Sequence, residues 1–158
     1  MLYIFGGLPA SGKSTLARHL SKLTGSVYLR VDTIEEAILE AGHSIGPEGY
    51  IAAYQIAAEN LDNGISVVAD SVNPIEITRS AWRNSATERG IEFVEIEIVC
   101  SNLGEHRQRL ESRLPGKRNL AWEDVINRVY ETWNGAQRFD TAGETASESC
   151  LRFERIFR

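Results

Sequence analysis

The sequence predicts a three-layer α/β fold, in which a parallel β-sheet is covered by helices on both faces. Two observations carry this prediction. Short apolar runs alternate along the chain with segments whose apolar residues recur at helical spacing. The first of these runs leads directly into a glycine-rich turn. Parallel strands need right-handed crossover connections, which helices supply, so the alternation favours a five-stranded parallel sheet in a single domain over residues 1–158.

The individual elements follow from runs, caps and turn residues. The predicted strands cover residues 2–5, 27–31, 65–69, 92–100 and 138–140. The predicted helices cover residues 13–23, 32–39, 50–61, 75–89, 103–114, 122–133 and 146–157. A loop at 42–49 separates two of the helices, and the Pro115-Gly116 break follows another. No repeat or interdomain linker interrupts this order.

Composition limits the class of protein. The chain has 158 residues, 42% of them hydrophobic, and a formal net charge of −5, which argues against a nucleic-acid coat or a membrane-surface protein with a broad basic face. Cys100 and Cys150 are the sole cysteines, so neither a disulfide framework nor metal-ligand spacing is expected. Together with the lack of a signal-peptide core or a membrane span, this indicates a cytoplasmic protein, either a monomer or a dimer.

The turn after the first strand has the spacing Gly7-x-x-x-x-Gly12-Lys13-Ser14. Glycines let backbone amides turn towards phosphate oxygens, and the N-terminus of the following helix adds a favourable partial charge. Lys13 would meet the β- and γ-phosphates, and the Ser14 hydroxyl would ligate Mg²⁺. The expected nucleotide-binding residues here are Gly7, Pro9, Ala10, Ser11, Gly12, Lys13, Ser14 and Thr15.

Two aspartates end predicted strands at the same edge of the sheet. Asp32 follows the second strand, where a carboxylate could accept the proton of an attacking hydroxyl; it could also, or instead, cap a helix in a capping box with Glu35. Asp70 ends the third strand, as a carboxylate that holds Mg²⁺ opposite a phosphate loop would do. A turn-forming role before Asn73-Pro74 is its alternative.

A basic segment stands out in this acidic chain. Five basic residues fall within twelve positions, and Glu111 alone opposes them: Arg107, Arg109, Arg113, Lys117 and Arg118. Arg109 and Arg113 are four residues apart and would share a helical face, from which guanidinium groups could neutralise a transferring phosphoryl group. The Pro-Gly break suggests a mobile lid over about 107–121, and the alternative is a solvated helical face.

The remaining candidates have plainer interpretations. His19, His43 and His106 are scattered without ligand spacing and are expected to be surface or helix residues. The tryptophans Trp82, Trp122 and Trp133 are expected on the apolar faces of helices, in the core.

Together these motifs resemble the small P-loop kinases related to adenylate kinase, the group around gluconate kinase, chloramphenicol phosphotransferase and polynucleotide 5′-kinase. The resemblance rests on residues 7–14, Asp32, Asp70 and the 109–113 stretch, and it extends over nearly the whole chain. It implies the P-loop NTPase fold with strand order 2-3-1-4-5, and ATP and Mg²⁺ as cofactors. It also implies an adenine pocket near Arg109 and the loop after the fifth strand, and a lid arginine at Arg113.

The acceptor is not identified by these motifs. After Asp32 the chain reads Thr33-Ile34-Glu35-Glu36, where several relatives place an arginine for an anionic acceptor, and this departure argues against a phosphate-bearing substrate. A kinase acting on a hydroxyl of a small molecule is the first hypothesis. The alternatives are a kinase of a polynucleotide or RNA 5′-hydroxyl end, and a nucleotide-dependent regulatory switch. Asp140-Thr-Ala-Gly143 matches a GTPase element but falls late in the chain and is interpreted as a turn at the end of a strand.

Overall fold

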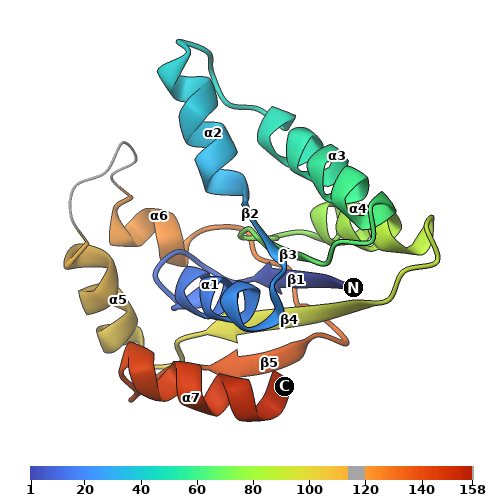
Figure 1. Ribbon diagram of the computed structural model, residues 1–158. Coiled ribbons are helices and arrows are strands. Elements are labelled where there is room, and N and C mark those ends of the chain that lie inside the picture. The colour runs from blue at the N-terminus through green and yellow to red at the C-terminus, as the bar shows by residue number, and fades with distance from the viewer. Residues whose placement is uncertain (114–119, 158) are drawn as a thin grey trace.

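The computed structural model describes residues 1–113 and 120–157, and it contains one five-stranded parallel sheet (Figure 1). The strands are β1 (Leu2–Gly6), β2 (Val27–Arg30), β3 (Val67–Asp70), β4 (Phe93–Val99) and β5 (Gln137–Asp140). Their order is β2-β3-β1-β4-β5, and every pairing is parallel. The predicted fold class and strand order are therefore confirmed.

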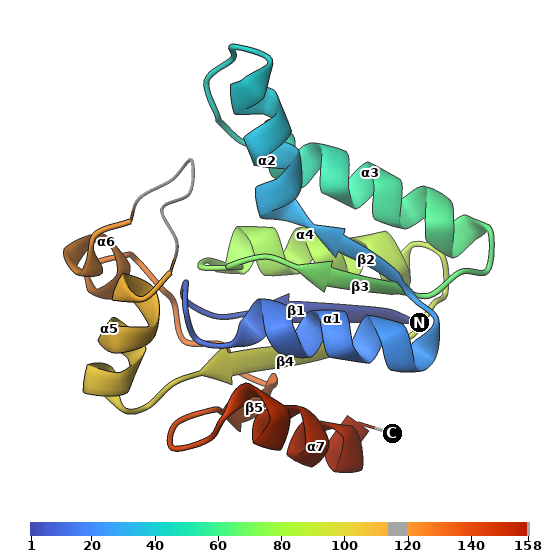
Figure 2. The ribbon, with the colours of Figure 1, turned by 60° about the vertical axis from the view of Figure 1, so that its left-hand side comes forward.

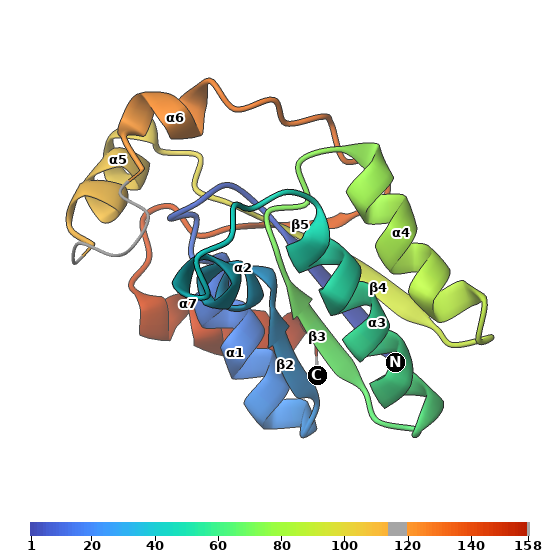
Figure 3. The same ribbon diagram turned by 90° about the horizontal axis from the view of Figure 1, so that it is seen from above.

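Helices cover both faces of the sheet, as the view from above shows (Figure 3). The helices are α1 (Lys13–Thr24), α2 (Val31–Glu40), α3 (Glu48–Asp62), α4 (Glu76–Thr87), α5 (Leu103–Glu111), α6 (Trp122–Ile126) and α7 (Ala146–Phe157). The pair α1 and α7 packs on one face, and α3 and α4 pack on the other. The helices α5 and α6 lie beyond the end of the sheet near the turn after β1 (Figure 2).

Strand β1 is the centre of both halves of the core. Its side chains alternate between the faces: Leu2 and Ile4 join the cluster that contains Trp82 of α4, whereas Phe5 joins the cluster that contains Phe153 of α7. A strand buried on both faces by apolar packing is held firmly. The turn that follows β1 therefore starts from a rigid support.

The helix predicted over 122–133 is wrong beyond Ile126, where α6 ends. Val129 is 72% exposed, whereas Trp133 is buried, so the apolar spacing did not mark one helical face. The guanidinium of Arg79 binds the carbonyl oxygens of Glu131 and Thr132, at 2.7 and 3.0 Å. These carbonyls accept from a buried arginine instead of from helical amides, and the segment after Ile126 forms no regular secondary structure.

The capping box predicted between Asp32 and Glu35 is also wrong. Helix α2 begins at Val31, its N-cap residue is Arg30, and no side chain caps it. Asp32 pairs with the Arg30 side chain instead. An ion pair with a neighbouring guanidinium offers this carboxylate a stronger partner than a backbone amide.

The basic segment is described only in part. Helix α5 ends at Glu111 rather than at residue 114, and residues 114–119, with Pro115, Lys117 and Arg118, lie outside the described residues. The predicted lid over 107–121 is thus represented by its two ends, and it stays a prediction. Within the described ranges, no helix is both long enough and apolar enough to cross a membrane.

Gly6 provides a test of the packing at the end of β1. A Cβ atom there would lie 2.1 Å from Cζ3 of Trp133, so we expect Gly6→Ala to reduce the free energy of unfolding by about 1–3 kcal/mol. Urea denaturation followed by circular dichroism measures this. Gly104→Ala on α5 is the control, because its nearest neighbour would be 3.4 Å away; it should be neutral or slightly stabilising. A Gly6→Ala protein as stable as the wild type would contradict this packing of Trp133.

Candidate functional site

The turn between β1 and α1 is shaped by left-handed backbone conformations. Gly7, Ala10 and Gly12 have φ angles of 142°, 67° and 96°. A Cβ on Gly7 would lie 2.2 Å from the carbonyl oxygen of Ile98, so no side chain fits there. The turn is anchored by the Gly7 amide, which donates to the Val72 carbonyl at 3.1 Å. These positions explain why the sequence needs glycine at both ends of the loop.

The N-terminus of α1 is left open for a ligand. Gly12 is its N-cap residue, no side chain caps the helix, and its first turn contains no acidic residue. The first amides of a helix have no partner within the helix, and the helix dipole favours an anion beside them. By contrast, α5 is capped by the Asn102 side chain, which accepts from the Glu105 amide at 3.1 Å. The open terminus of α1 has the properties of a phosphate site.

Lys13 and Asp70 form a buried ion pair at this loop. Lys13 Nζ lies 2.5 Å from Asp70 Oδ1, and the two side chains are 7% and 0% exposed. The Tyr28 hydroxyl donates to the other carboxylate oxygen at 2.6 Å. The Ser14 hydroxyl also favours the ionised form of this carboxylate. Residues from β2, β3 and α1 therefore meet at Asp70, and three of them (Lys13, Ser14 and Asp70) were predicted from the sequence.

The charge of Asp70 depends on these neighbours. Burial favours the neutral acid, but the ammonium of Lys13, assisted by hydrogen bonds from Lys13, Tyr28 and Ser14, holds the pKa of Asp70 below its usual range. Burial, together with the negative charge of Asp70 and the hydrogen bond to its carboxylate, raises the pKa of the Tyr28 hydroxyl above its usual value. Asp70 is thus an anion and Tyr28 a neutral donor at physiological pH.

The donor set at Asp70 fits Mg²⁺ bound together with a nucleotide. A carboxylate and a hydroxyl are oxygen ligands, and Mg²⁺ usually takes one or two protein oxygens and completes its shell with phosphates and water. Among the described residues, no group of three or more His, Cys, Asp or Glu could hold a metal ion without such help. Ser14 and Asp70 are the residues that would hold the ion.

Asp32 lies beside this cluster and is joined to it by Arg30. Arg30 Nη2 lies 2.7 Å from Asp32 Oδ2, and Arg30 Nε lies 3.9 Å from Asp70 Oδ2. The Arg113 side chain is exposed and lies within electrostatic range of this pair, since desolvation and the positive charge of Arg30 lower its pKa while Asp32 opposes that shift. Asp32 and Asp70, predicted separately from two parts of the chain, therefore both form ion pairs with Arg30.

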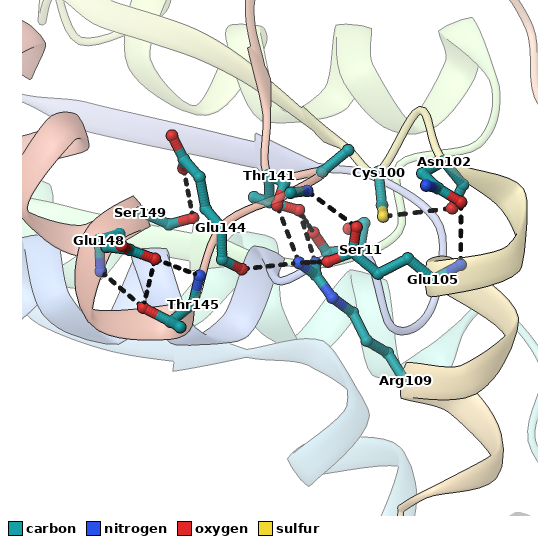
Figure 4. Close-up of polar contacts among 12 residues, drawn as sticks. Ser11, Cys100, Asn102, Glu105, Arg109, Thr141, Glu144, Thr145, Glu148 and Ser149 are labelled. Carbon is teal, nitrogen blue, oxygen red and sulfur yellow. Dashed lines mark hydrogen bonds and ion pairs between the residues drawn. The ribbon is translucent and has the colours of Figure 1, made fainter.

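Arg109 serves a different part of the site (Figure 4). Its guanidinium donates to the hydroxyl and carbonyl oxygens of Thr141, at 2.7 and 2.8 Å, and to the Glu144 carbonyl at 3.1 Å. Glu105 pairs with it from one turn before on α5, at 2.5 Å. The Thr141 hydroxyl also donates to the Ser11 carbonyl at 2.8 Å. Arg109 thus fixes the loop after β5 against the phosphate loop.

A cavity of about 380 Å³ opens between this loop and α1. Such a volume is in the range of small-ligand sites. The lining residues come from the phosphate loop, α1, α5, the loop after β5 and α7: Ala10, Gly12, Thr15, Leu16, Arg109, Arg113, Thr141, Glu144, Thr145, Ala146 and Ser149. The cavity adjoins the phosphate loop on the side opposite to β2 and β3, where a nucleoside attached to bound phosphates would lie.

Several residues of the site were not predicted from the sequence. His106, on helix α5 as expected, is buried rather than on the surface; its Nε2 lies 2.7 Å from the Pro9 carbonyl, and its ring packs edge-on against Trp122. Arg30, Tyr28 and Thr141 also have site contacts. None lies in a recognisable motif, although Arg30 and Tyr28 do precede Asp32 on one face of a strand. The Asp140–Gly143 stretch forms the predicted turn at the end of β5, in which Asp140 accepts from the Ala142 amide.

The fold and this loop define a P-loop protein. The chain belongs to the AAA domain family, whose sequence pattern matches residues 2–133. It is also 27% identical over 159 aligned residues to an uncharacterized protein of Mycobacterium tuberculosis strain H37Rv and to one of Mycobacterium bovis. These alignments cover 90% of this chain and 32% of the relatives, so the chain spans about a third of the length of the curated relatives it matches.

Solved structures share the same architecture. The Mycobacterium tuberculosis APS kinase CysC in complex with AMPPNP and APS aligns with a TM-score of 0.75 and 19% identity, over 98% of this chain and 95% of that chain. Chaetomium thermophilum Kti12 in complex with ADP-AlF3 aligns with a TM-score of 0.70 and 19% identity, over 99% and 97%. A gluconokinase from Sinorhizobium meliloti 1021 gives 0.64 and 15%, over 98% and 91%. The chain therefore has the fold of the P-loop kinases.

The Lys13–Asp70 pair predicts a pH-dependent stability difference. Because the folded state lowers the pKa of Asp70, the pair stabilises the fold above about pH 4, the unfolded value, and this stabilisation is lost as pH falls through the folded pKa. In Lys13→Met the buried carboxylate loses its cation, which we expect to cost about 3–5 kcal/mol at pH 7. At pH 3 the cost should be much smaller, because protonation removes the uncompensated charge.

Urea denaturation of both proteins at pH 7 and pH 3 measures this difference. Lys22→Met is the matched control, because Lys22 is an exposed residue in the last turn of the same helix. It should have little effect at either pH. A cost of Lys13→Met that is equal at the two values would contradict the assigned charge state of Asp70.

Proposed function

We propose that this protein is an ATP-dependent phosphotransferase that moves the γ-phosphoryl group to a hydroxyl of a small-molecule acceptor. The observation that carries the proposal is the series of ion pairs that runs from Lys13 through Asp70 and Arg30 to Asp32, beside an open phosphate loop. A loop that only bound and released nucleotide would not need a second carboxylate at this position. The likeness to the structures of an APS kinase and a gluconokinase supports the same interpretation.

The donor half of the reaction uses the loop and its surroundings. Amides of the phosphate loop and of the start of α1, such as those of Gly12, Lys13 and Ser14, would receive the phosphate oxygens, with the Lys13 ammonium as the compensating charge. The Gly7 amide instead holds the turn through its bond to the Val72 carbonyl. Ser14 and Asp70 would hold Mg²⁺, which supplies further neutralisation of the phosphate charge when bound. The cavity against Arg109 would receive the nucleoside, and we assign adenine to it.

The transfer step needs a base and a cation. The acceptor hydroxyl oxygen forms a bond to the γ-phosphorus, the bond from that phosphorus to the β–γ bridging oxygen breaks, and ADP leaves with the electron pair. Asp32 takes the proton of the hydroxyl, and its pairing with Arg30 orients its carboxylate. Arg113, close to Arg30 and Asp32, would neutralise charge on the transferring group.

Two other functions stay open as outcomes of the same measurements. A polynucleotide or RNA 5′-hydroxyl kinase would use the same donor half with a different acceptor. A regulatory switch would bind nucleotide and a partner without phosphorylating a small molecule. The proposal therefore depends on detecting a phosphorylated product, not only nucleotide binding.

The Asp32→Asn substitution tests whether Asp32 acts in phosphate transfer or has only a structural role. We expect phosphate transfer from labelled ATP to fall about 10²–10⁴-fold while ATP affinity, measured by calorimetry, stays within twofold, because Asp32 lies away from the nucleoside cavity. Lys13→Met should lose ATP affinity instead. Glu36→Gln is the control, since Glu36 lies one turn further along α2. If Asp32→Asn transfers phosphate at the wild-type rate, Asp32 is not the base.

Arg113→Ala tests the lid cation. We expect the turnover rate to fall about 10³-fold, the low end of what a phosphoryl-stabilising arginine supplies, with a smaller change in the KM for ATP. Arg107→Ala is the comparison, because Arg107 lies on the same segment but pairs with Glu111 on an exposed face. Equal effects of the two substitutions on turnover would show that general positive charge, rather than the position of Arg113, matters.

A further inference from the structure

A second polar cluster lies next to Asp32 and shares only Arg30 with the phosphate site. It consists of Arg30 at the end of β2, Tyr50 in the first turn of α3, and Ser71 and Asn73 just after β3. Tyr50 joins them because its hydroxyl accepts from the Asn73 amide at 3.2 Å. The carboxylates of Asp32 and Glu35 lie close enough to Tyr50 to act on its hydroxyl.

Two members of the cluster hold buried acceptor oxygens without partners. Ser71 and Asn73 are 2% and 0% exposed, and neither Ser71 Oγ nor Asn73 Oδ1 has a hydrogen-bond partner in the part of the chain that the structure describes. The Asn73 amide nitrogen donates to the Phe5 carbonyl at 2.8 Å, which fixes the orientation of the side chain and leaves its oxygen unused. Asn73 also has a φ of 49°, an uncommon conformation outside glycine that often marks functional sites.

The other two members hold donors. Arg30 gives one nitrogen to Asp32, but its Nε is buried without a hydrogen-bond partner among the described residues. Burial raises the pKa of Tyr50, the Asn73 amide and the nearby Ser71 hydroxyl oppose this shift, and the carboxylates of Glu35 and Asp32 add to it, so that the pKa stays raised. The phenol is therefore neutral, and its own proton is available beside the bond it accepts from Asn73.

Buried polar groups without partners are rare, because the cost of removing them from water is not recovered. Three such atoms in one cluster, adjacent to the proposed base, indicate a ligand that supplies the missing bonds. The required ligand must accept hydrogen bonds from Arg30 and Tyr50 and donate one to Asn73. With the Ser71 hydroxyl it can either donate or accept a hydrogen bond. A hydroxyl group both donates and accepts, so a compound with several hydroxyls fits this pattern.

Charged ligands fit less well. A phosphate or carboxylate only accepts, and it would lie beside the unpartnered oxygen of Asn73 and the negative charge of Asp32. A cation would meet Arg30 and Arg113. Arg30 itself is already neutralised by Asp32, at 2.7 Å, so the cluster does not offer an unpaired charge for either kind of ligand.

We propose that Arg30, Tyr50, Ser71 and Asn73 bind the acceptor, and that the acceptor is an uncharged polyhydroxy compound such as a sugar, a polyol or a nucleoside. This inference rests on the proposed phosphotransferase function and names the substrate class of the same site. One hydroxyl of the acceptor faces Asp32, which takes its proton, while the others bond to the cluster. The phosphoryl group then passes to that hydroxyl in the step described above.

A panel of matched acceptors tests the class. Neutral sugars, polyols and nucleosides are compared with their phosphates, sugar acids and amino sugars, and with 5′-hydroxyl oligonucleotides, using labelled ATP and separation of products. We expect transfer to at least one neutral compound and at least 100-fold less to its charged derivative. Preferred transfer to a charged compound or to an oligonucleotide would overturn the inference. The inference would also be overturned if no neutral compound were phosphorylated while the protein still bound ATP and this binding depended on Lys13. That result would leave the assignment of the nucleotide site unaffected.

Ser71→Ala tests the residues with the neutral acceptor found in the panel. The Ser71 hydroxyl lies near the Tyr50 hydroxyl but has no well-formed hydrogen bond in the described structure, so its loss should change the melting temperature little and leave the KM for ATP unchanged. The KM for the acceptor should rise about tenfold, the effect of one lost hydrogen bond. Ser85→Ala is the control, since this buried serine bonds to the Ala81 carbonyl within α4 and should leave the acceptor KM unchanged. An unchanged acceptor KM in both Ser71→Ala and Tyr50→Phe would overturn the assignment.

Discussion

The buried ion pair between Lys13 and Asp70 joins the start of α1 to the end of β3, and the rest of the site is arranged around it. Tyr28 and Arg30 reach Asp70 from β2, so three neighbouring elements are aligned by one carboxylate. A buried charge is tolerated only when it is paired and hydrogen-bonded. This requirement constrains the positions of the phosphate loop, the proposed metal ligand and, through Arg30, the proposed base.

The arginines of this protein have different roles, and the role of each depends on its surroundings. Arg79 is fully buried, donates to main-chain carbonyls and lies over the rings of Tyr130 and Trp133, so it holds the segment near Trp133 against the loop after β3. Arg109 fixes the loop after β5 with the same kind of bonds. Arg30 and Arg113 instead lie near Asp32 and Asp70, where a guanidinium can act on a substrate. The planar fork of arginine suits both tasks.

The parts of the fold with local or strictly repeating signals were predictable. The strand order followed from the resemblance to P-loop kinases, and the turn at residues 7–14 from its glycines. The end of helix α6 at Ile126 was not predictable, because the irregular course of the chain from there to Trp133 depends on bonds from Arg79, about fifty residues earlier, to the carbonyls of Glu131 and Thr132. The cap of α2 failed for a related reason, since Asp32 prefers the guanidinium of Arg30 to a backbone amide.

The sequence by itself determined the phosphate loop, Asp70 at the end of β3 and Asp32 just beyond β2 in the first turn of α2, because these depend on residues adjacent in the chain and on the common edge of a parallel sheet. Only the tertiary structure decided which side chains complete them. Arg30 and Ser71 lie on adjacent segments that meet through pairing of β2 with β3, and Tyr50 arrives on α3 from a different part of the chain. Contacts of this kind follow from packing between elements, for which local spacing contains no signal. The proposed acceptor side of the site therefore depends on the folded protein, whereas the phosphate loop of the proposed nucleotide side can be read from eight consecutive residues.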